Sequence, residues 1–227
     1  MNAQPRMVEV RARILKENDV LARELRQRFE DAGVTVVSFV SSPGSGKTTF
    51  LETLMSRLNH RWRIAALVGD LATENDAARL RRACPLVKQI VTGTVCHLDA
   101  KMISAALDDW KLDELDLLFI ENVGNLVCPA NYDLGEAMRV VLLSATEGED
   151  KPLKYPTIFN TADVAVITKM DIAEACEFNL GDARHNIHSV RPAMQILEIS
   201  SKTGRGIDAA IGLVESRIPE ARKAQAV

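Results

Sequence analysis

The chain has few aromatic residues, few cysteines and no long apolar segment, and each shortage excludes a class of protein. Of its 227 residues, 4% are aromatic and four are cysteines, which indicates thiols or metal ligands rather than a disulfide framework. The longest apolar runs have the length of a strand, which excludes a membrane-spanning helix. The charged N-terminus lacks the apolar core of a signal peptide, so we expect a cytoplasmic protein.

Concentrated positive charge is also missing. The formal net charge is −3, and no run of lysine or arginine interrupts the sequence. Nucleic acids and anionic membranes attract proteins through clustered basic side chains. Neither is therefore an expected partner.

Short apolar segments alternate with helical patterns along most of the chain. Strands are expected at residues 34–40, 63–68, 87–91, 115–120, 140–145, 164–168 and 195–199. Helices are expected at residues 8–32, 47–59, 74–83, 97–109, 180–190 and 207–217. This alternation predicts an α/β fold with a mostly parallel sheet of about seven strands and helices on both faces. We expect a helical extension over residues 1–33, ended by Gly33, and an α/β domain over residues 34–227. The charged stretch 147–156, with two prolines, is expected to be a loop.

The segment 41–48 reads SSPGSGKT and lies between a predicted strand and a predicted helix. Backbone N–H groups of such a loop, together with the helix N-terminus, bind phosphate. Lys47 is expected to reach the β- and γ-phosphates and Thr48 to bind Mg²⁺. A simple turn would leave Lys47 without a partner at a helix start, where the dipole disfavours a cation. Ser41 stands where the usual pattern has its first glycine. The residues expected to hold the phosphates are Gly44, Ser45, Gly46, Lys47, Thr48 and Thr49.

Two later segments resemble the loops by which GTPases recognise guanine. Residues 168–171 read TKMD, in which Asp171 would accept hydrogen bonds from guanine and Lys169 would cover the purine ring. Thr168 replaces the usual asparagine of that motif. Ser201 and Lys202 belong to the string SSKTG, which follows the last predicted strand. Each string alone is also compatible with a capped helix. Their order after a phosphate loop predicts GTP or GDP as the ligand.

Two carboxylates are expected at the ends of buried strands. Glu121 follows the strand 115–120 and precedes Gly124, and Asp70 follows the strand 63–68. Mg²⁺ prefers oxygen ligands, so Thr48, Asp70 and Glu121 are the expected magnesium ligands. Lys47, Asp70 and Glu121 form the expected catalytic set. A helix cap or turn is the other interpretation of Asp70, and Thr73 is expected to cap the next helix.

Soft metal ligands lie in two loops of the predicted sheet. Cys96 and His97 follow the strand 87–91 at the expected start of a helix, and Cys128 follows Gly124. Thiolate and imidazole suit Zn²⁺ or Ni²⁺. If the strands 87–91 and 115–120 are neighbours, the three side chains converge. A buried cysteine or a capping histidine remains an alternative for each residue alone, because no C-x-x-C pair is present. Cys84, and Cys176 within a helix, are expected to pack as small hydrophobic residues. His185 and His188 are expected on an exposed helix face.

The chain resembles the HypB family of hydrogenase maturation factors, GTPase metallochaperones that help to deliver nickel to [NiFe]-hydrogenase. The resemblance lies in SSPGSGKTT, GDLATENDAARL, GTVCHLDA, LLFIENVGNLVCPA, EGEDKPLKYPTIF, ITKMD and SSKTGRGID, which span residues 34 to 208. It implies a dimer-forming P-loop GTPase domain over residues 34–227, with a Ni²⁺ or Zn²⁺ site at Cys96, His97 and Cys128. Slow turnover is expected because no arginine finger is identifiable in the sequence. It further implies a homodimer in the GTP- or metal-bound state, with a nickel-binding HypA-type protein and the hydrogenase large subunit as partners. Members often carry an N-terminal cysteine or histidine motif; residues 1–31 contain neither residue type, so no separate nickel site is expected there.

Nucleotide state and metal binding are expected to be coupled, because the loop that begins at Glu121 runs into Cys128. Three other functions are compatible with parts of the pattern. A urease-type nickel GTPase would show Cys-Pro-His where this chain has Cys96-His97. A P-loop small-molecule kinase would use ATP. A zinc-storage protein would leave the nucleotide site idle.

Overall fold

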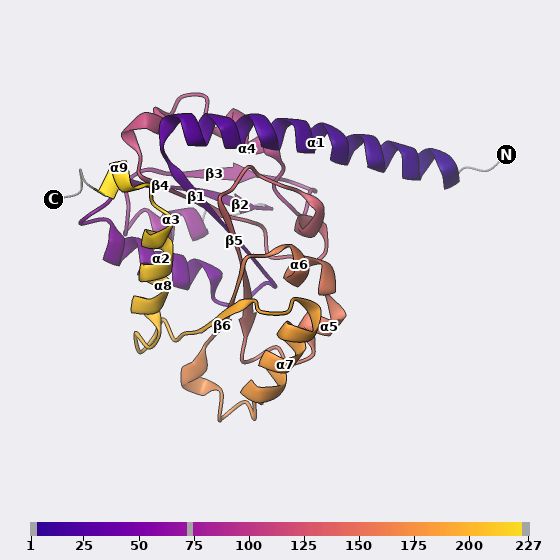
Figure 1. Ribbon diagram of the computed structural model, residues 1–227, viewed down its shortest axis with the longest axis vertical. Helices are drawn as coiled ribbons and strands as arrows, with labels where there is room; N and C mark the ends of the chain where they lie inside the picture. The colour runs from indigo at the N-terminus through magenta and orange to yellow at the C-terminus, as the bar shows by residue number, and fades with distance from the viewer. Residues whose placement is uncertain (1–3, 72–74, 224–227) are drawn as a thin grey trace.

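The computed structural model describes residues 4–71 and 75–223, and these form one parallel sheet with helices on both faces (Figure 1). The seven strands are arranged in the order β3-β2-β4-β1-β5-β6-β7. They are β1 Thr35–Ser41, β2 Ile64–Asp70, β3 Val87–Val91, β4 Leu117–Glu121, β5 Met138–Ser144, β6 Val164–Thr168 and β7 Gln195–Glu198. The predicted fold class and strand number are confirmed, and strand ends differ by at most a few residues.

Helices cover both faces of this sheet. The α-helices are α1 Gln4–Ala32, α2 Lys47–Leu58, α3 Asn75–Leu80, α4 Ala100–Ala106, α5 Lys151–Lys154, α6 Pro156–Thr161, α7 Leu180–Val190, α8 Ile207–Ser216 and α9 Glu220–Lys223. The short 3₁₀ helices are η1 Leu112–Glu114, η2 Cys128–Asn131 and η3 Met170–Ile172. One face packs against α2, α3 and α8. The other packs against α1 and α4 over β1, β2 and β4, and against α6 and α7 over β5 and β6.

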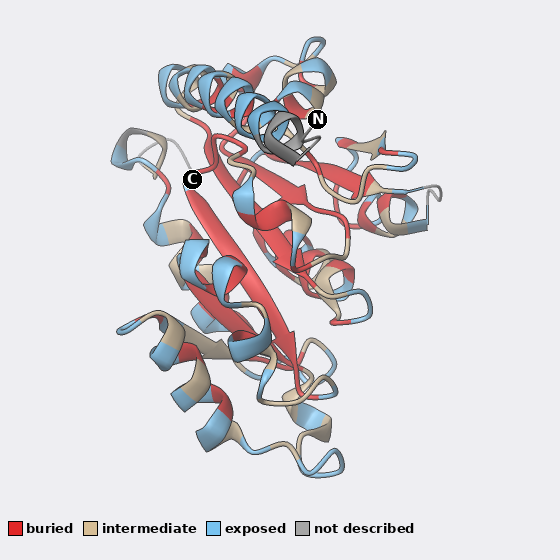
Figure 2. Cartoon of the chain, turned by 90° about the vertical axis from the view of Figure 1, so that its right-hand side faces the viewer, coloured by how far each residue is buried: buried red, intermediate tan, exposed pale blue. Residues whose placement is uncertain are grey.

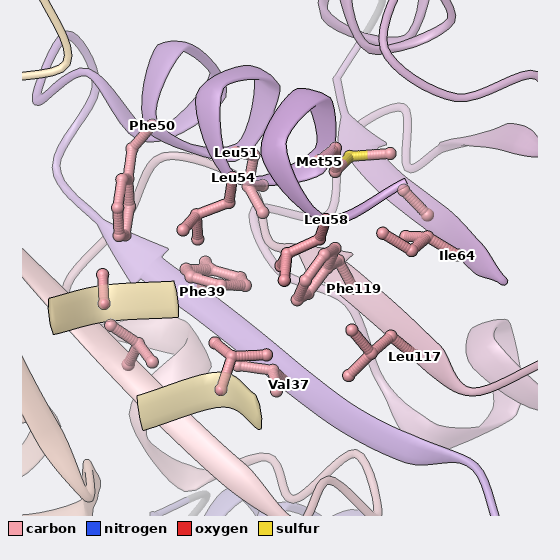
Figure 3. Packing of buried hydrophobic residues seen from close by; sticks show 14 of the residues in the cluster. Val37, Phe39, Phe50, Leu51, Leu54, Met55, Leu58, Ile64, Leu117 and Phe119 are labelled. Atoms are coloured by element: carbon pink, nitrogen blue, oxygen red, sulfur yellow. The ribbon is translucent and has the colours of Figure 1, made fainter. Parts of the chain in front are cut away.

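Alternation of side chains along the central strands places an apolar core on each face. Val37 and Phe39 of β1 point toward α2 (Figure 3), whereas Val36 and Val40 belong to the clusters on the opposite face. The Phe39 ring lies edge-on to Phe50, with ring centroids 6.0 Å apart. Figure 2 shows the strands buried between helices whose outer surfaces are exposed. A parallel sheet buried on both faces has the β-branched and apolar strand sequences seen here.

Helix α1 packs on the sheet only through its C-terminal half. Ala22, Leu25 and Phe29 are buried in the cluster shared with β1, β2 and β4. The helix ends at Gly33 with φ 68°, whose N–H donates to the carbonyl of Glu30, while the next N–H donates to Phe29. This Schellman arrangement requires the left-handed conformation that glycine adopts readily. The N-terminal half extends beyond the rest of the molecule (Figure 1). Among the described residues no helix is long and apolar enough to cross a membrane.

Two sequence predictions about helices are wrong. The stretch 147–156, predicted as a loop, contains α5 and leads directly into α6. Pro152 and Pro156 lie in the first turn of these helices, where the missing N–H of proline breaks no hydrogen bond. The helix predicted from residue 97 begins only at Ala100, because the Asp99 side chain caps it by accepting from the Met102 N–H at 2.8 Å. The predicted cap Thr73 lies outside the described residues.

Candidate nucleotide and metal sites

The phosphate loop joins β1 to α2 and lines a cleft of about 520 Å³ at the carboxyl edge of the sheet. Gly44 and Gly46 have φ values of 75° and 90°, which explains why this loop contains glycine at both positions. Ser41, in place of the first glycine, is the last residue of β1 and keeps a negative φ. The cleft is lined by residues 42–49 of the loop and by Asp70, Leu71, Asp76, Arg79, Val123, Gly124 and Lys169.

Glu121 contacts both chemically important side chains at the end of this loop. Its Oε1 accepts from Lys47 Nζ at 2.9 Å and from Thr48 Oγ1 at 2.6 Å. The Glu121 side chain is 1% exposed, so the buried carboxylate compensates the charge of Lys47. Its other oxygen, Oε2, has no hydrogen-bond partner among the described residues. The partner that Lys47 needs in the absence of phosphate is therefore Glu121.

The oxygen atoms needed by Mg²⁺ lie around the same cleft. Asp70, at the end of β2, lines the cleft and accepts from the Leu71 N–H at 2.7 Å. Thr48 and Glu121 contribute a hydroxyl and a buried carboxylate oxygen without a partner in the part of the chain that the structure describes. These hard oxygen donors fit magnesium.

The predicted guanine motif, residues 168–171, makes hydrogen bonds to the phosphate loop. Thr168 Oγ1 donates to the Ser45 carbonyl at 2.6 Å, so threonine at the usual asparagine position still contacts that loop. Lys169 has φ 58°, and its Nζ donates to the Gly44 carbonyl at 2.7 Å. Asp171 accepts from Ser200 Oγ at 2.7 Å.

Asp171 remains ionised under ordinary conditions. The hydrogen bond from Ser200 lowers the pKa of its carboxyl, and the charges of Lys202 and Lys169 act in the same direction. An exposed carboxylate at this place is able to accept two hydrogen bonds from a purine edge. Ser201 is half-buried and Lys202 is exposed in the neighbouring loop.

The predicted soft-metal ligands converge. The ligand atoms of Cys96, His97 and Cys128 all lie within 4.8 Å of one another. The two Sγ atoms are 2.8 Å apart. His97 Nδ1 is buried and has no partner within residues 4–71 and 75–223, and its ring lies against Tyr132 with centroids 4.0 Å apart. Two sulfurs and an imidazole nitrogen form a donor set suited to nickel or zinc.

Two of the three ligands of this cluster, His97 and Cys128, are neutral near pH 7 when no metal is bound. Burial lowers the pKa of His97, although the charge of Asp99 opposes that effect, so the imidazole is neutral near pH 7. The hydrogen bond with Cys96 raises the pKa of Cys128, and burial and the charge of Cys96 add to the increase. A metal ion must therefore displace the thiol proton of Cys128 on binding.

The route by which the ligands meet differs from the prediction, because β2 lies between β3 and β4. The loop after β3 crosses the end of β2, where Gly69 leaves room for it. A Cβ atom at residue 69 would lie 2.7 Å from a carbon of Leu98. Leu98 donates its N–H to Asn122 Oδ1 at 3.0 Å, and Asn125 Nδ2 donates to the Cys96 carbonyl at 3.3 Å. Sequence reasoning missed both asparagines, since no motif spacing marks contacts made to backbone atoms of another loop.

The loop from Glu121 to Cys128 also touches the phosphate loop. A Cβ atom at Gly124 would lie 3.0 Å from the backbone of Pro43, so these two segments are in close contact. Cys128 begins η2 at the far end of the same loop. One short peptide therefore contacts both candidate sites.

The remaining cysteines and histidines lie elsewhere. Cys84 is buried and its Sγ donates to the Ile64 carbonyl at 2.9 Å, as expected for a packed thiol. The prediction for Cys176 is wrong, because this residue is exposed in a turn before α7. His185 and His188 are exposed on α7, as predicted.

The parallel sheet, the phosphate loop and the Lys-Thr pair at the start of α2 define the chain as a P-loop NTPase. The family described as CobW/HypB/UreG, nucleotide-binding domain, matches residues 34–198. The hydrogenase maturation factor HypB of Rhizobium leguminosarum bv. viciae is 47% identical over 98% of this chain and 74% of its own length. The hydrogenase/urease maturation factor HypB of Helicobacter pylori is 43% identical over 91% of this chain and 86% of its own.

A solved structure agrees with these relatives. The crystal structure of HypB from Helicobacter pylori in complex with nickel has a TM-score of 0.84 and 41% identity to this chain. The similarity covers 92% of this chain and 97% of that one. The chain therefore belongs to the CobW/HypB/UreG family and, within it, to the HypB hydrogenase maturation factors.

Proposed function

We propose that this protein hydrolyses GTP and uses the nucleotide cycle to bind and release nickel during [NiFe]-hydrogenase maturation. The observation that carries the proposal is the loop from Glu121 to Cys128. Glu121 contacts Lys47 and Thr48 at the nucleotide cleft, and Cys128 completes the Cys96–His97 cluster. Relatives named as hydrogenase maturation factors and a related structure in complex with nickel support this function.

In this proposal Lys47 exchanges partners when GTP binds. Its ammonium group leaves Glu121 and neutralises phosphate charge, while backbone N–H groups of the loop hold the phosphates. Thr48, Glu121 and Asp70 would hold Mg²⁺, which would supply positive charge beside the phosphates of the bound nucleotide. Asp171 and Lys169 select guanine. Because Gly124 lies against Pro43, movement of the Glu121 loop changes the position of Cys128 relative to Cys96 and His97.

Nickel is the cargo in this scheme, and zinc competes for the same ligands. Three protein ligands leave coordination positions for water, a second subunit or a recipient protein. We propose a homodimer in the GTP- or metal-bound state. Its partners are a HypA-type nickel protein and the hydrogenase large subunit. Because Helicobacter pylori relatives carry the name hydrogenase/urease maturation factor, delivery to urease is the second candidate function.

Two measurements test the function. Competition between GTP and ATP for the cleft distinguishes a GTPase from a small-molecule kinase, and we expect ATP to compete weakly. Nickel titrations with GDP and with a slowly hydrolysed GTP analogue should differ in affinity by about 5–150-fold, the usual range of coupling between sites. Equal nickel affinity in both nucleotide states would contradict the proposal, as would the absence of GTP turnover with and without metal.

A further inference from the structure

A buried asparagine on α1 lies on the apolar side of that helix. Asn18 is 5% exposed and precedes Ala22, Leu25 and Phe29 on the same face, at the spacing of core positions. A buried amide is unfavourable there unless each of its polar atoms is hydrogen-bonded. Such a break in the apolar pattern occurs preferentially at functional sites.

Both polar atoms of the Asn18 amide bind backbone groups that flank the metal cluster. Its Oδ1 accepts from the Ala100 N–H at 2.9 Å, at the start of α4 just after the His97 loop. Its Nδ2 donates to the Asp133 carbonyl at 2.9 Å. Asp133 follows Tyr132, whose ring lies against the His97 ring. One side chain therefore connects the backbone on both sides of this imidazole.

Neighbouring contacts also hold the backbone between His97 and the two residues that Asn18 binds, Ala100 and Asp133. Leu98, between His97 and Ala100, is fully buried against Gly69 and donates its N–H to Asn122. On the other side, Arg139 donates to the Tyr132 carbonyl at 2.7 Å.

The segment that carries Tyr132 is also fitted closely to α1. Gly135 has φ 78°, and a Cβ atom there would lie 2.8 Å from the Ala22 carbonyl oxygen. The close approach of this turn to the helix requires glycine. Helix α1 thus contacts the Tyr132 segment through backbone as well as through the Asn18 amide.

We infer that Asn18 is a positioning residue for the metal cluster and that α1 is part of the cargo site. The inference rests on the proposed metal site and adds to it a residue that contacts no metal. By fixing Ala100 and Asp133, Asn18 holds the His97 ring between its own loop and Tyr132, so that the imidazole faces the two thiols. Residues that orient metal ligands typically change affinity about 10–100-fold when they are replaced.

The test uses two variants of the full chain. Asn18→Ala removes both hydrogen bonds and should weaken nickel affinity about tenfold, with an altered sulfur-to-nickel charge-transfer absorption. Asn18→Asp keeps the acceptor for Ala100 but sets an oxygen against the Asp133 carbonyl oxygen, so its nickel affinity should also fall below that of the wild-type protein. Nickel affinity is measured by competition with a chelator, and GTP affinity should stay within about twofold.

The matched control is Asn59→Ala. Asn59 Nδ2 likewise donates to a backbone carbonyl, that of Ala83 at 2.7 Å, but it lies at the end of α2 that is remote from the phosphate loop. This control should leave affinity and spectrum unchanged. If Asn18→Ala fails to fold, Asn18→Asp decides alone. Wild-type nickel affinity and spectrum in the folded Asn18 variants would overturn the inference. A wild-type protein that binds no nickel would instead overturn the proposed function, and this inference with it.

Discussion

The nucleotide cleft and the metal cluster lie at the same edge of the sheet but are built in different ways. The cleft comes mainly from one continuous loop, in which positive φ values at Gly44 and Gly46 fix the backbone. The cluster is assembled from two loops that meet across the end of β2, and side chains from other segments hold it. A continuous loop encodes its shape locally, whereas an assembled site depends on residues distant in sequence.

The largest expected effect is a loss of GTP turnover with little change in nickel binding. Lys47→Ala removes the cation that faces phosphate and should lower GTP turnover at least about 100-fold, the usual effect of losing one stabilising group. Nickel affinity without nucleotide should change less than about twofold. Turnover is measured by phosphate release.

The control for that prediction is Lys111→Ala, which removes an exposed lysine that forms an ion pair with Glu114. It should keep wild-type turnover. If Lys47→Ala also abolished nickel binding, the two sites would not be separable as described.

The reciprocal experiment removes one sulfur ligand. Cys96→Ala or Cys128→Ala should weaken nickel and zinc binding about 100-fold or more, because one of three strong ligands is lost. GTP affinity should be nearly unchanged. Cys176→Ala is the matched control, since that thiol is exposed and lies in a turn outside the cluster. The site would be rejected if calorimetry found wild-type nickel affinity in Cys96→Ala and Cys128→Ala, as expected for the Cys176→Ala control.

Lower pH should weaken metal binding and leave nucleotide affinity nearly unchanged. The raised pKa of Cys128 means that its thiol is protonated without metal, so binding releases protons and affinity rises with pH. The proton released from Cys128 contributes about a tenfold change in metal affinity per pH unit below the raised pKa of that thiol. Because the pKa of His97 is lowered, the imidazole adds no further proton near pH 7. Titrations at several pH values measure how metal affinity depends on pH, and Cys128→Ala should reduce that dependence.

A smaller change should weaken the communication between the sites while preserving both. Gly124→Ala introduces a methyl group about 3.0 Å from the Pro43 backbone and should move the two loops apart. The difference in nickel affinity between GDP and GTP-analogue states should then decrease, typically by about 1 kcal/mol or more. An unchanged difference would show that communication runs by another route.

The smallest effect on either site is expected from a substitution at the amino ends of the strands, opposite the carboxyl ends where both sites lie. Asp116 accepts three hydrogen bonds from Arg63, including one of 2.6 Å from Nη2. Burial raises the pKa of Asp116, but the bonds and charge of Arg63, with the charge of Arg222, outweigh burial and lower it. This contribution to stability is present above the unfolded pKa of about 3.9 and is lost as the pH falls through the folded value.

Asp116→Asn should therefore reduce the free energy of unfolding by about 1–3 kcal/mol at pH 7, and by less under acidic conditions. Urea denaturation at both pH values measures this difference. GTP and nickel affinities should stay at wild-type values. A large loss of nickel affinity would show that the metal cluster depends on general stability.

The contrast between the sites also explains what the sequence could predict. Buried β-branched strands and the SSPGSGKT loop encode their structures within a few residues, so the parallel sheet and the phosphate loop were predictable. The convergence of Cys96, His97 and Cys128 was predicted for a wrong reason, since β3 and β4 are not neighbours. Gly69, Asn122 and Asn18 act across the fold, and no local pattern predicts such contacts. Pro152 and Pro156 predicted a loop where two short helices begin, because proline both interrupts helices and begins them.

The pairing of Glu121 with Lys47 and Thr48 has a consequence for the resting protein. The cleft contains its own counter-ion for Lys47, so the charge of this ammonium group is compensated within the protein. An entering phosphate competes with an internal anion for the same ammonium group. Phosphate binding therefore requires Lys47 to release the Glu121 carboxylate. The cost of breaking this contact lowers the net affinity for nucleotide.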